Sequence, residues 1–172
     1  MKLAKLYNEI KEAFDFQNIK SVKIRKLSKF VYESEDGRLD VKFADVSDIA
    51  VIPVFLQNAT EIYNVEYKID ERDDQAYKTD FKEFIGILKG VKDAIDDFIS
   101  NNQPDILLII SADRGGSFTT DSTKDKIYKY AILKNLPTGY NADTDVIVYD
   151  GLDTRGIRMY KKTIRETLFA NH

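Results

Sequence analysis

The apolar positions in residues 79–111 predict a long amphipathic helix followed by a buried strand. In the first part, apolar side chains recur at spacings of three and four residues, which places them on one stripe of a helix. These side chains are Phe81, Phe84, Ile85, Leu88, Val91, Ile95, Phe98 and Ile99. The unbroken apolar run 106–110 follows Pro104, and so short a run is typical of a central strand covered on both faces. We expect this helix and strand to form the centre of the fold.

Two glycines lie one turn apart on the predicted helix, at Gly86 and Gly90. Glycine in a helix interior costs about 1 kcal/mol relative to alanine. We therefore expect that at least one of them marks the close approach of a neighbouring segment.

Upstream of the helix, short apolar runs and alternating patterns predict several strands. The expected strands are residues 22–25, 30–35, 39–45, 49–56 and 61–69. Asp36-Gly37 stands between the second and third of these and is a common hairpin turn dipeptide. Pro53 confines the fourth to an edge or a bulge. Most of the sheet should therefore be antiparallel.

Three more helices and one more strand complete the prediction. The helices are expected at residues 3–14, 121–136 and 157–169, and the strand at 146–149. A chain of 172 residues without an internal repeat or a Pro/Ser-rich linker favours one domain, residues 1–172. The predicted fold class is α+β, a mainly antiparallel sheet with a central amphipathic helix packed on it.

The composition restricts the chemistry that the chain can carry. There is no cysteine and one histidine, His172, so thiolate sites and histidine-based catalysis are not expected. The formal net charge of −3 gives no electrostatic case for general nucleic-acid binding. No stretch approaches the ~18 apolar residues of a membrane span. We expect neither a cofactor nor a metal, and no membrane insertion.

A first candidate site lies on the strand before the central helix, where two-residue spacing puts Glu66 and Lys68 on one face. With Asp45 or Asp48 upstream, this pattern resembles the core of PD-(D/E)xK nucleases. The resemblance implies carboxylates that hold Mg²⁺ and a lysine that orients water or steadies the phosphate. The alternative interpretation is a solvated strand face.

A second candidate is the loop that leaves the predicted central strand. It contains Arg114, Gly115 and Gly116, whose backbone N–H groups and guanidinium could approach an anion. A flexible connection explains the same residues.

A third candidate is basic and lies near the end of the chain. If residues 157–169 form a helix, Arg158, Lys162 and Arg165 share the face opposite its apolar stripe. Such a face could meet phosphates or an acidic partner. The alternative is the wet side of a surface helix.

The order of predicted elements resembles the GNAT acetyltransferase fold, in which the central helix follows a long strand and covers acyl-CoA. The resemblance extends to Lys126-Ile127-Tyr128 followed by Gly139-Tyr140. It implies that Tyr128 would be the general acid toward the CoA thiolate. Active members carry a glycine-containing loop before the central helix, whose amides hold the pyrophosphate. Here residues 70–74 supply four carboxylates, one arginine and no glycine.

Residues 84–136 are also similar to small uncharacterised proteins encoded by tailed phages. The similarity lies in the run Pro-Asp-Ile-Leu-Leu-Ile-Ile-Ser-Ala and the later Lys-Ile-Tyr. Our leading hypothesis is therefore a non-enzymatic phage accessory or virion protein, in the virion or the host cytoplasm, that binds a host or virion protein. A divergent acyltransferase using Tyr128 and a nuclease using Glu66 and Lys68 are the alternatives.

Overall fold

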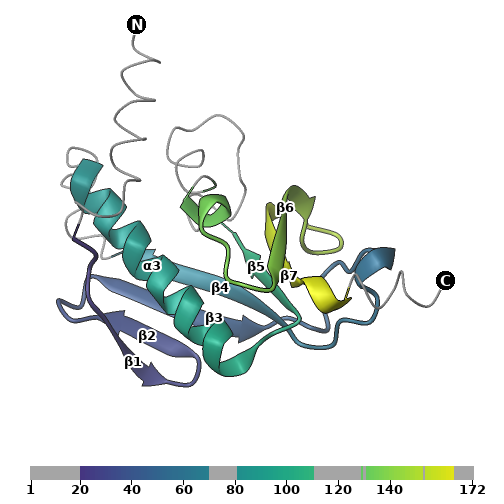
Figure 1. Ribbon diagram of the computed structural model, residues 1–172, viewed down its shortest axis with the longest axis horizontal. Coiled ribbons are helices and arrows are strands. Elements are labelled where there is room, and N and C mark those ends of the chain that lie inside the picture. The colour runs from purple at the N-terminus through teal and green to yellow at the C-terminus, as the bar shows by residue number, and fades with distance from the viewer. Residues whose placement is uncertain (1–19, 70–80, 111–128, 130, 153, 165–172) are drawn as a thin grey trace, which may run out of the picture.

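The computed structural model describes residues 20–69, 81–110, 129, 131–152 and 154–164, with only the backbone of residues 81–84 (Figure 1). The predicted helix at residues 3–14 lies outside these ranges. In chain order the elements are β1 (Ile24–Ser28), β2 (Val31–Ser34), β3 (Leu39–Asp45), the 3₁₀ helix η1 (Val54–Leu56), β4 (Ile62–Ile69), α3 (Phe81–Asn102), β5 (Ile106–Ile109), β6 (Tyr140–Ile147) and β7 (Arg155–Lys161). The predicted α+β class is confirmed.

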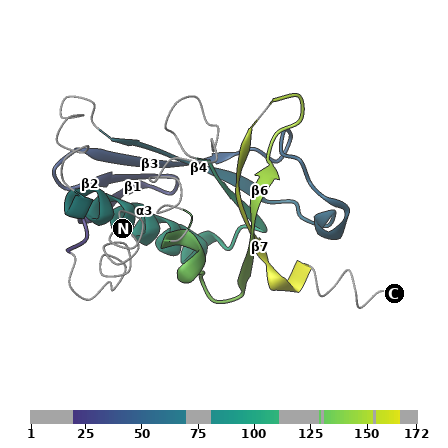
Figure 2. The same cartoon turned by 90° about the horizontal axis from the view of Figure 1, so that it is seen from above.

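In the described part of the chain, seven strands form one sheet in the order β1-β2-β3-β4-β5-β7-β6. Neighbouring strands are antiparallel except β4 and β5, which are parallel and are joined through α3. Figure 2 shows α3 along one side of strands β1 to β4, with β6 and β7 at the opposite end from β1. The sheet is thus mainly antiparallel, as the patterns predicted.

The hairpin between β2 and β3 forms where Asp36-Gly37 predicted it. Gly37 has a φ of +75°, a conformation that glycine adopts without the strain a side chain would add. The Asp36 carboxylate accepts hydrogen bonds from the Ser34 hydroxyl at 2.6 Å and from the Arg38 N–H at 3.1 Å. Local chemistry is therefore sufficient to fix this turn.

The larger core lies between α3 and one face of the sheet. Phe98 is fully buried, and its ring stacks on Phe43 of β3 with 4.0 Å between the ring centroids. From β5, Leu107 and Ile109 point into this core. The helical stripe predicted from Ile85 to Ile99 is buried, which confirms that part of the prediction.

A second core covers the opposite face of β4, β5 and β7. Alternation sends Ile106 and Leu108 of β5 to this side, where they join Tyr160 of β7. The cover is the segment of residues 46–60, which we call the strap and which buries Leu56 completely. The apolar run of β5 is therefore covered on both faces, as predicted.

Both helix glycines mark close approaches, which confirms that prediction. A Cβ on Gly86 would stand 3.0 Å from the carbonyl oxygen of Lys20. A Cβ on Gly90 would stand 3.2 Å from both the Val22 carbonyl oxygen and the Leu39 side chain. Glycine thus lets the segment before β1 pass close to α3.

The expected strand at residues 49–56 is wrong. The strap forms only an isolated bridge between Ala50 and Tyr149 and then the short helix η1 after Pro53. Proline has no N–H to donate to a ladder, and the chain instead crosses the second core.

The expected helix at residues 157–169 is wrong in its first part, because Arg155–Lys161 is the strand β7; residues 162–164, the last that the structure describes, are helical. Ile157 enters the core under α3, whereas Tyr160 enters the core under the strap. Residues 155–161 form a strand and not a helix because they pair with β5 on one side and with β6 on the other.

Two other predictions need smaller corrections. The last predicted strand, residues 146–149, is instead β6, which begins at Tyr140 and contains an irregularity between Asp143 and Val146. Of the helix expected at residues 121–136, the described residues 129 and 131–134 are helical.

In the described part of the chain, no helix combines the length and the apolar character needed to cross a membrane.

Candidate functional site

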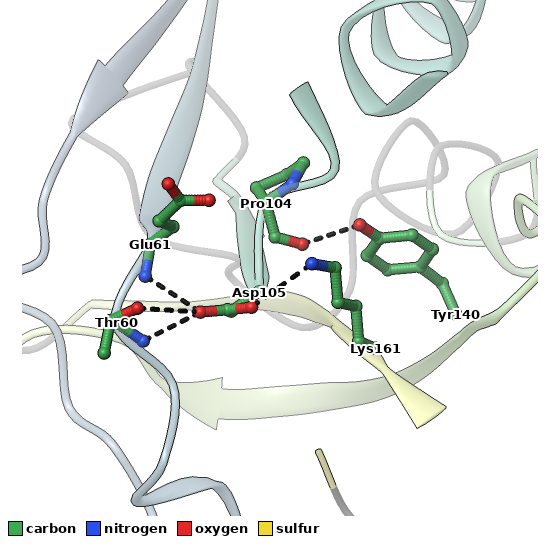
Figure 3. Close-up of polar contacts among 6 residues, drawn as sticks. All are labelled: Thr60, Glu61, Pro104, Asp105, Tyr140 and Lys161. Carbon is green, nitrogen blue, oxygen red and sulfur yellow. Dashed lines mark hydrogen bonds and ion pairs between the residues drawn. The ribbon is translucent and has the colours of Figure 1, made fainter. Parts of the chain in front are cut away.

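A polar cluster joins three strands at the junction between α3 and β5 and borders a pocket, which makes it a candidate functional site (Figure 3). One oxygen of the Asp105 carboxylate accepts hydrogen bonds from the Thr60 N–H at 2.9 Å, the Thr60 hydroxyl at 3.2 Å and the Glu61 N–H at 3.1 Å. Its other oxygen accepts one from the Lys161 ammonium at 3.3 Å. The chain entering β4 and the end of β7 are therefore both tied to the residue that precedes β5.

The electrostatics of Asp105 follow from these contacts. Burial raises the pKa of its carboxyl, but the hydrogen bonds from Thr60, Glu61 and Lys161 favour the ionised form and outweigh burial. The net effect is a pKa below the ordinary value. Asp105 is thus an anion at neutral pH, with Lys161 as its counter-ion.

Tyr140 of β6 completes the cluster. Its hydroxyl donates a hydrogen bond to the carbonyl oxygen of Pro104 at 2.6 Å. Burial, followed by the negative charges of Asp105 and Glu61, raises the pKa of Tyr140 well above its ordinary value. The tyrosine is therefore neutral at physiological pH.

A pocket of about 460 Å³ opens beside this cluster, between the end of α3 and the start of β6. It is lined by Asp96, Ile99, Ser100, Gln103, Pro137, Thr138, Gly139, Tyr140, Lys161 and Thr163. The polar groups that the pocket shares with the cluster, on Tyr140 and Lys161, are already bonded to Pro104 and Asp105. The geometry therefore makes this cluster a fixed wall of the pocket.

Arg158 lies far from the exposed position that the helix prediction gave it. It projects from β7 and is 6% exposed, with an ion pair to Asp143 of β6 at 3.0 Å. Its guanidinium lies over the Phe55 ring of the strap, 5.5 Å from the centroid. The predicted basic face of Arg158, Lys162 and Arg165 is therefore wrong, because Arg158 is a buried strand residue. Lys162 lies just after β7, and Arg165 is outside the described residues.

Glu66 and Lys68 do share one face of β4, as the spacing predicted, and both are exposed. They lie opposite Lys42 and Asp40 of β3, on the side of the sheet away from α3. Asp45 is instead opposite Tyr63, whose ring packs against Phe98 of α3. The sheet therefore puts Asp45 and Glu66 on opposite faces, and they do not form one metal site.

Five of the predicted site residues lie outside the described residues: Tyr128, Arg114, Gly115, Gly116 and Arg165. Asp48 is described and is exposed in the turn after β3. Within the described ranges, no three Asp, Glu, His or Cys side chains come close enough together to hold a metal ion.

The sequence interpretation missed the cluster around Asp105. Its partners Thr60, Glu61 and Lys161 are 45, 44 and 56 residues away along the chain. No local sequence motif therefore predicts these contacts. The available signal was an aspartate between Pro104 and the apolar run of β5.

Comparison with known proteins adds no relative: no protein-family profile, curated protein or solved structure matches the chain.

Proposed function

We propose that the chain is a non-enzymatic accessory protein of the kind that tailed phages encode, and that it acts by binding another protein in the virion or in the host cytoplasm. The observation that supports this proposal is a set of exposed apolar side chains on two segments that contact each other, the strap and the β6–β7 hairpin. Ile49 and Val54 of the strap are 58% and 77% exposed, and Ile147 and Leu152 of the β6–β7 hairpin are 51% and 59% exposed. Exposed apolar side chains that gather in one region mark interaction sites.

The strap and the hairpin that carry these side chains are joined to each other. Ala50 bridges Tyr149, and the Val51 N–H donates to the Val148 carbonyl oxygen at 2.8 Å. The backbone under the exposed side chains is therefore held in place before a partner arrives. Preorganisation of this kind lowers the entropic cost of binding.

The polar cluster favours binding over chemistry. Asp105 is ionised and has hydrogen bonds to both oxygens, and Tyr140 is neutral and donates to a backbone carbonyl. A catalytic acid or base needs a pKa near the working pH and a free path to substrate. Asp105 and Tyr140 both have pKa values shifted away from neutrality, so a structural role suits them better.

Site-specific photo-crosslinking tests the proposal. A photoreactive phenylalanine analogue is placed at Ile147 or at Leu152. The variant is produced in the cells that naturally make the protein, and these cells are irradiated. We expect the same discrete protein adduct from both positions, identified by mass spectrometry. The matched control is the analogue at Lys68, an exposed position on another part of the sheet. An equal adduct from Lys68, or none from either hairpin position, would overturn the proposal.

A divergent GNAT-like acyltransferase is the second candidate, and one feature of the topology favours it. In the described chain, α3 follows the long strand β4 and packs on the sheet, as the resemblance implies. The parallel partners β4 and β5 pair only at residues 62–65 of β4, although β4 continues to Ile69. Open sheets place ligands beyond the carboxyl ends of parallel strands, which is where these two strands cease to pair.

The charge of residues 70–74 weighs against that candidate. Unit charges about 4 Å apart interact by roughly 1 kcal/mol in water and several times more near a protein surface. Four carboxylates and one arginine would therefore oppose a pyrophosphate by several kcal/mol.

Isothermal titration with acetyl-CoA tests the acyltransferase alternative. At micromolar protein we expect no binding, and we expect Tyr128→Phe to change nothing in that titration. Saturable binding that disappears in Tyr128→Phe would favour the acyltransferase. A thermal shift with Mg²⁺ or Mn²⁺ that disappears in Glu66→Gln would favour the nuclease instead.

A further inference from the structure

The edge strand β1 and the residues beside it carry positive charge, although the chain as a whole is negative. Residues 20–29 contain five basic side chains and no acidic one, in a chain with a net charge of −3. All five are exposed: Lys20, Lys23, Arg25, Lys26 and Lys29. The local charge therefore differs in sign from that of the whole chain.

Two of the five charges are compensated. Arg25 forms an ion pair with Glu33 at 2.9 Å, and Lys26 lies 3.9 Å from Asp97 of α3. Lys20, Lys23 and Lys29 have no carboxylate within ion-pair distance among the described residues, and Lys29 lies over the Phe30 ring. This leaves three ammonium groups beside the strand for an external anion.

The backbone of β1 is open on the side away from β2. The Glu35 N–H donates to the Lys23 carbonyl oxygen at 2.9 Å, and Arg25 lies opposite Glu33. In an antiparallel pair, hydrogen-bonded and non-hydrogen-bonded residues alternate. The N–H and C=O groups of Ile24 and Lys26 therefore point outward from the edge of the sheet that the structure describes.

We propose that β1 binds an acidic, extended segment of a partner protein, which adds to the sheet as one more strand. Backbone groups at Ile24 and Lys26 would form the ladder, and Lys23 and Lys29 would select carboxylates. Leu27, which is 54% exposed at the irregularity between Lys26 and Ser28, offers an apolar contact beside them. Strand addition of this kind gains affinity from main-chain hydrogen bonds and specificity from side chains.

The same features disfavour other occupants. Lysine and a bulge on an edge strand discourage pairing with a like strand. Two copies of β1 would bring basic side chains against basic side chains, so a second copy is a poor partner. A phosphate backbone has no N–H groups to pair with the outward C=O groups of Ile24 and Lys26, whereas a peptide strand can pair with both their N–H and C=O groups.

This inference rests on the proposed protein-binding function but places the partner on a different surface. Crosslinking at Ile147 and Leu152 does not involve β1, so the failure of one proposal can be told from the failure of the other.

Fluorescence anisotropy with a short labelled peptide of alternating glutamate and valine, capped at both ends, tests the inference on the full chain. We expect saturable binding that weakens as salt is raised, because ion pairs at a surface are screened. The double variant Lys23→Glu/Lys29→Glu should weaken binding about tenfold or more, a change of roughly 1.4 kcal/mol. Lys68→Glu makes one such substitution on an interior strand, half the charge change of the double variant, and should leave the affinity unaltered.

Two further probes separate strand addition from plain charge attraction. An otherwise identical peptide with N-methyl groups on alternate residues cannot complete a ladder, and we expect it not to bind. Equal binding of the methylated peptide would overturn strand addition. Tighter binding of an oligothymidine, lost in the same double variant, would assign the strand to single-stranded nucleic acid instead. Absence of binding by the acidic peptide would show that the lysines serve only to keep the edge unpaired.

Discussion

At the scale of the residue, Asp105 connects segments that are distant in sequence through one carboxylate. Its hydrogen bonds reach Thr60 and Glu61 ahead of β4 and Lys161 at the end of β7. Gly156 has a comparable role through the absence of a side chain. A Cβ at that position would stand 2.6 Å from the carbonyl oxygen of Ile109. The structure therefore requires an aspartate at 105 and a glycine at 156 because of contacts with residues that are distant in the sequence.

Asp105→Asn should destabilise the protein by about 1–3 kcal/mol at neutral pH, since a buried hydrogen-bonded charge is lost. The folded-state pKa of Asp105 lies below the unfolded value of about 4. Its contribution is therefore present above pH ~4 and is lost as the pH falls through the folded pKa. Urea unfolding of wild type and variant at neutral pH and near pH 3 should show the difference shrinking in acid. A difference that is equal at both pH values would contradict this account.

Gly156→Ala should cost about 1–3 kcal/mol, because the new methyl group meets backbone that has no rotamer to change. The matched control is Gly86→Ala, whose Cβ would meet the Lys20 carbonyl oxygen at 3.0 Å. That variant recovers about 1 kcal/mol of helix propensity and should lose less. Denaturant titration measures both, and a greater loss for Gly86→Ala would show that β7 can shift away from β5.

At the scale of the element, α3 covers one face of the sheet, and the strap covers the part of the other face formed by β5, β7 and the start of β4. The helix contributes the stacked Phe98 and the buried Leu88, which is 3% exposed. The strap contributes Leu56, which is fully buried, and Phe55, whose ring meets Tyr160 edge-on. A segment with little regular structure thus covers its core as completely as a helix of 22 residues.

Leu88→Ala and Leu56→Ala should each destabilise by roughly 2–5 kcal/mol, as buried large-to-small changes do. Leu152→Ala is the matched control, because that side chain is exposed, and it should stay within about 0.5 kcal/mol. Chemical denaturation gives all three values. A loss below about 1 kcal/mol for Leu56→Ala would show that the strap is not an integral part of the core.

At the scale of the whole molecule, the two cores share strands β4, β5 and β7. Alternate residues of β5 enter opposite cores, so loosening one core disturbs the packing of the other. This architecture predicts one cooperative unit. The β6–β7 hairpin, with its exposed Ile147 and Leu152, lies at one end of the sheet and the basic edge strand β1 at the other.

Thermal or urea unfolding should therefore show a single transition. Far-UV circular dichroism reports the sheet and α3, and near-UV signals report tyrosines such as Tyr160 in the strap core and Tyr32 in the helix core. We expect the two curves to coincide in the wild type and to shift together in Leu56→Ala. An earlier transition in the near-UV signal alone would indicate that the strap core opens by itself.

How much of this could be predicted depends on the range of the interactions concerned. The helix at Phe81–Asn102, the strand at Ile106–Ile109 and the hairpin at Asp36-Gly37 were predictable, because periodicity and turn chemistry act within a few residues. The candidate site was not. Asp105 finds its partners through the pairing of β4, β5 and β7, whereas the sequence suggested candidates such as Glu66 and Lys68, which are exposed on a sheet face.

The sequence by itself determined the amphipathic helix, the buried strand, the α+β class and the absence of cysteine chemistry, because each depends on composition or local spacing. The tertiary structure alone decided that residues 155–161 are a strand, since the three-residue spacing of Ile157 and Tyr160 fits a helix and it is pairing with β5 and β6 that puts them on opposite faces of a sheet. It also decided that Arg158 is buried against Asp143 and Phe55. Strand partners, and the faces they assign, come from contacts between residues far apart in the chain, which no local pattern specifies.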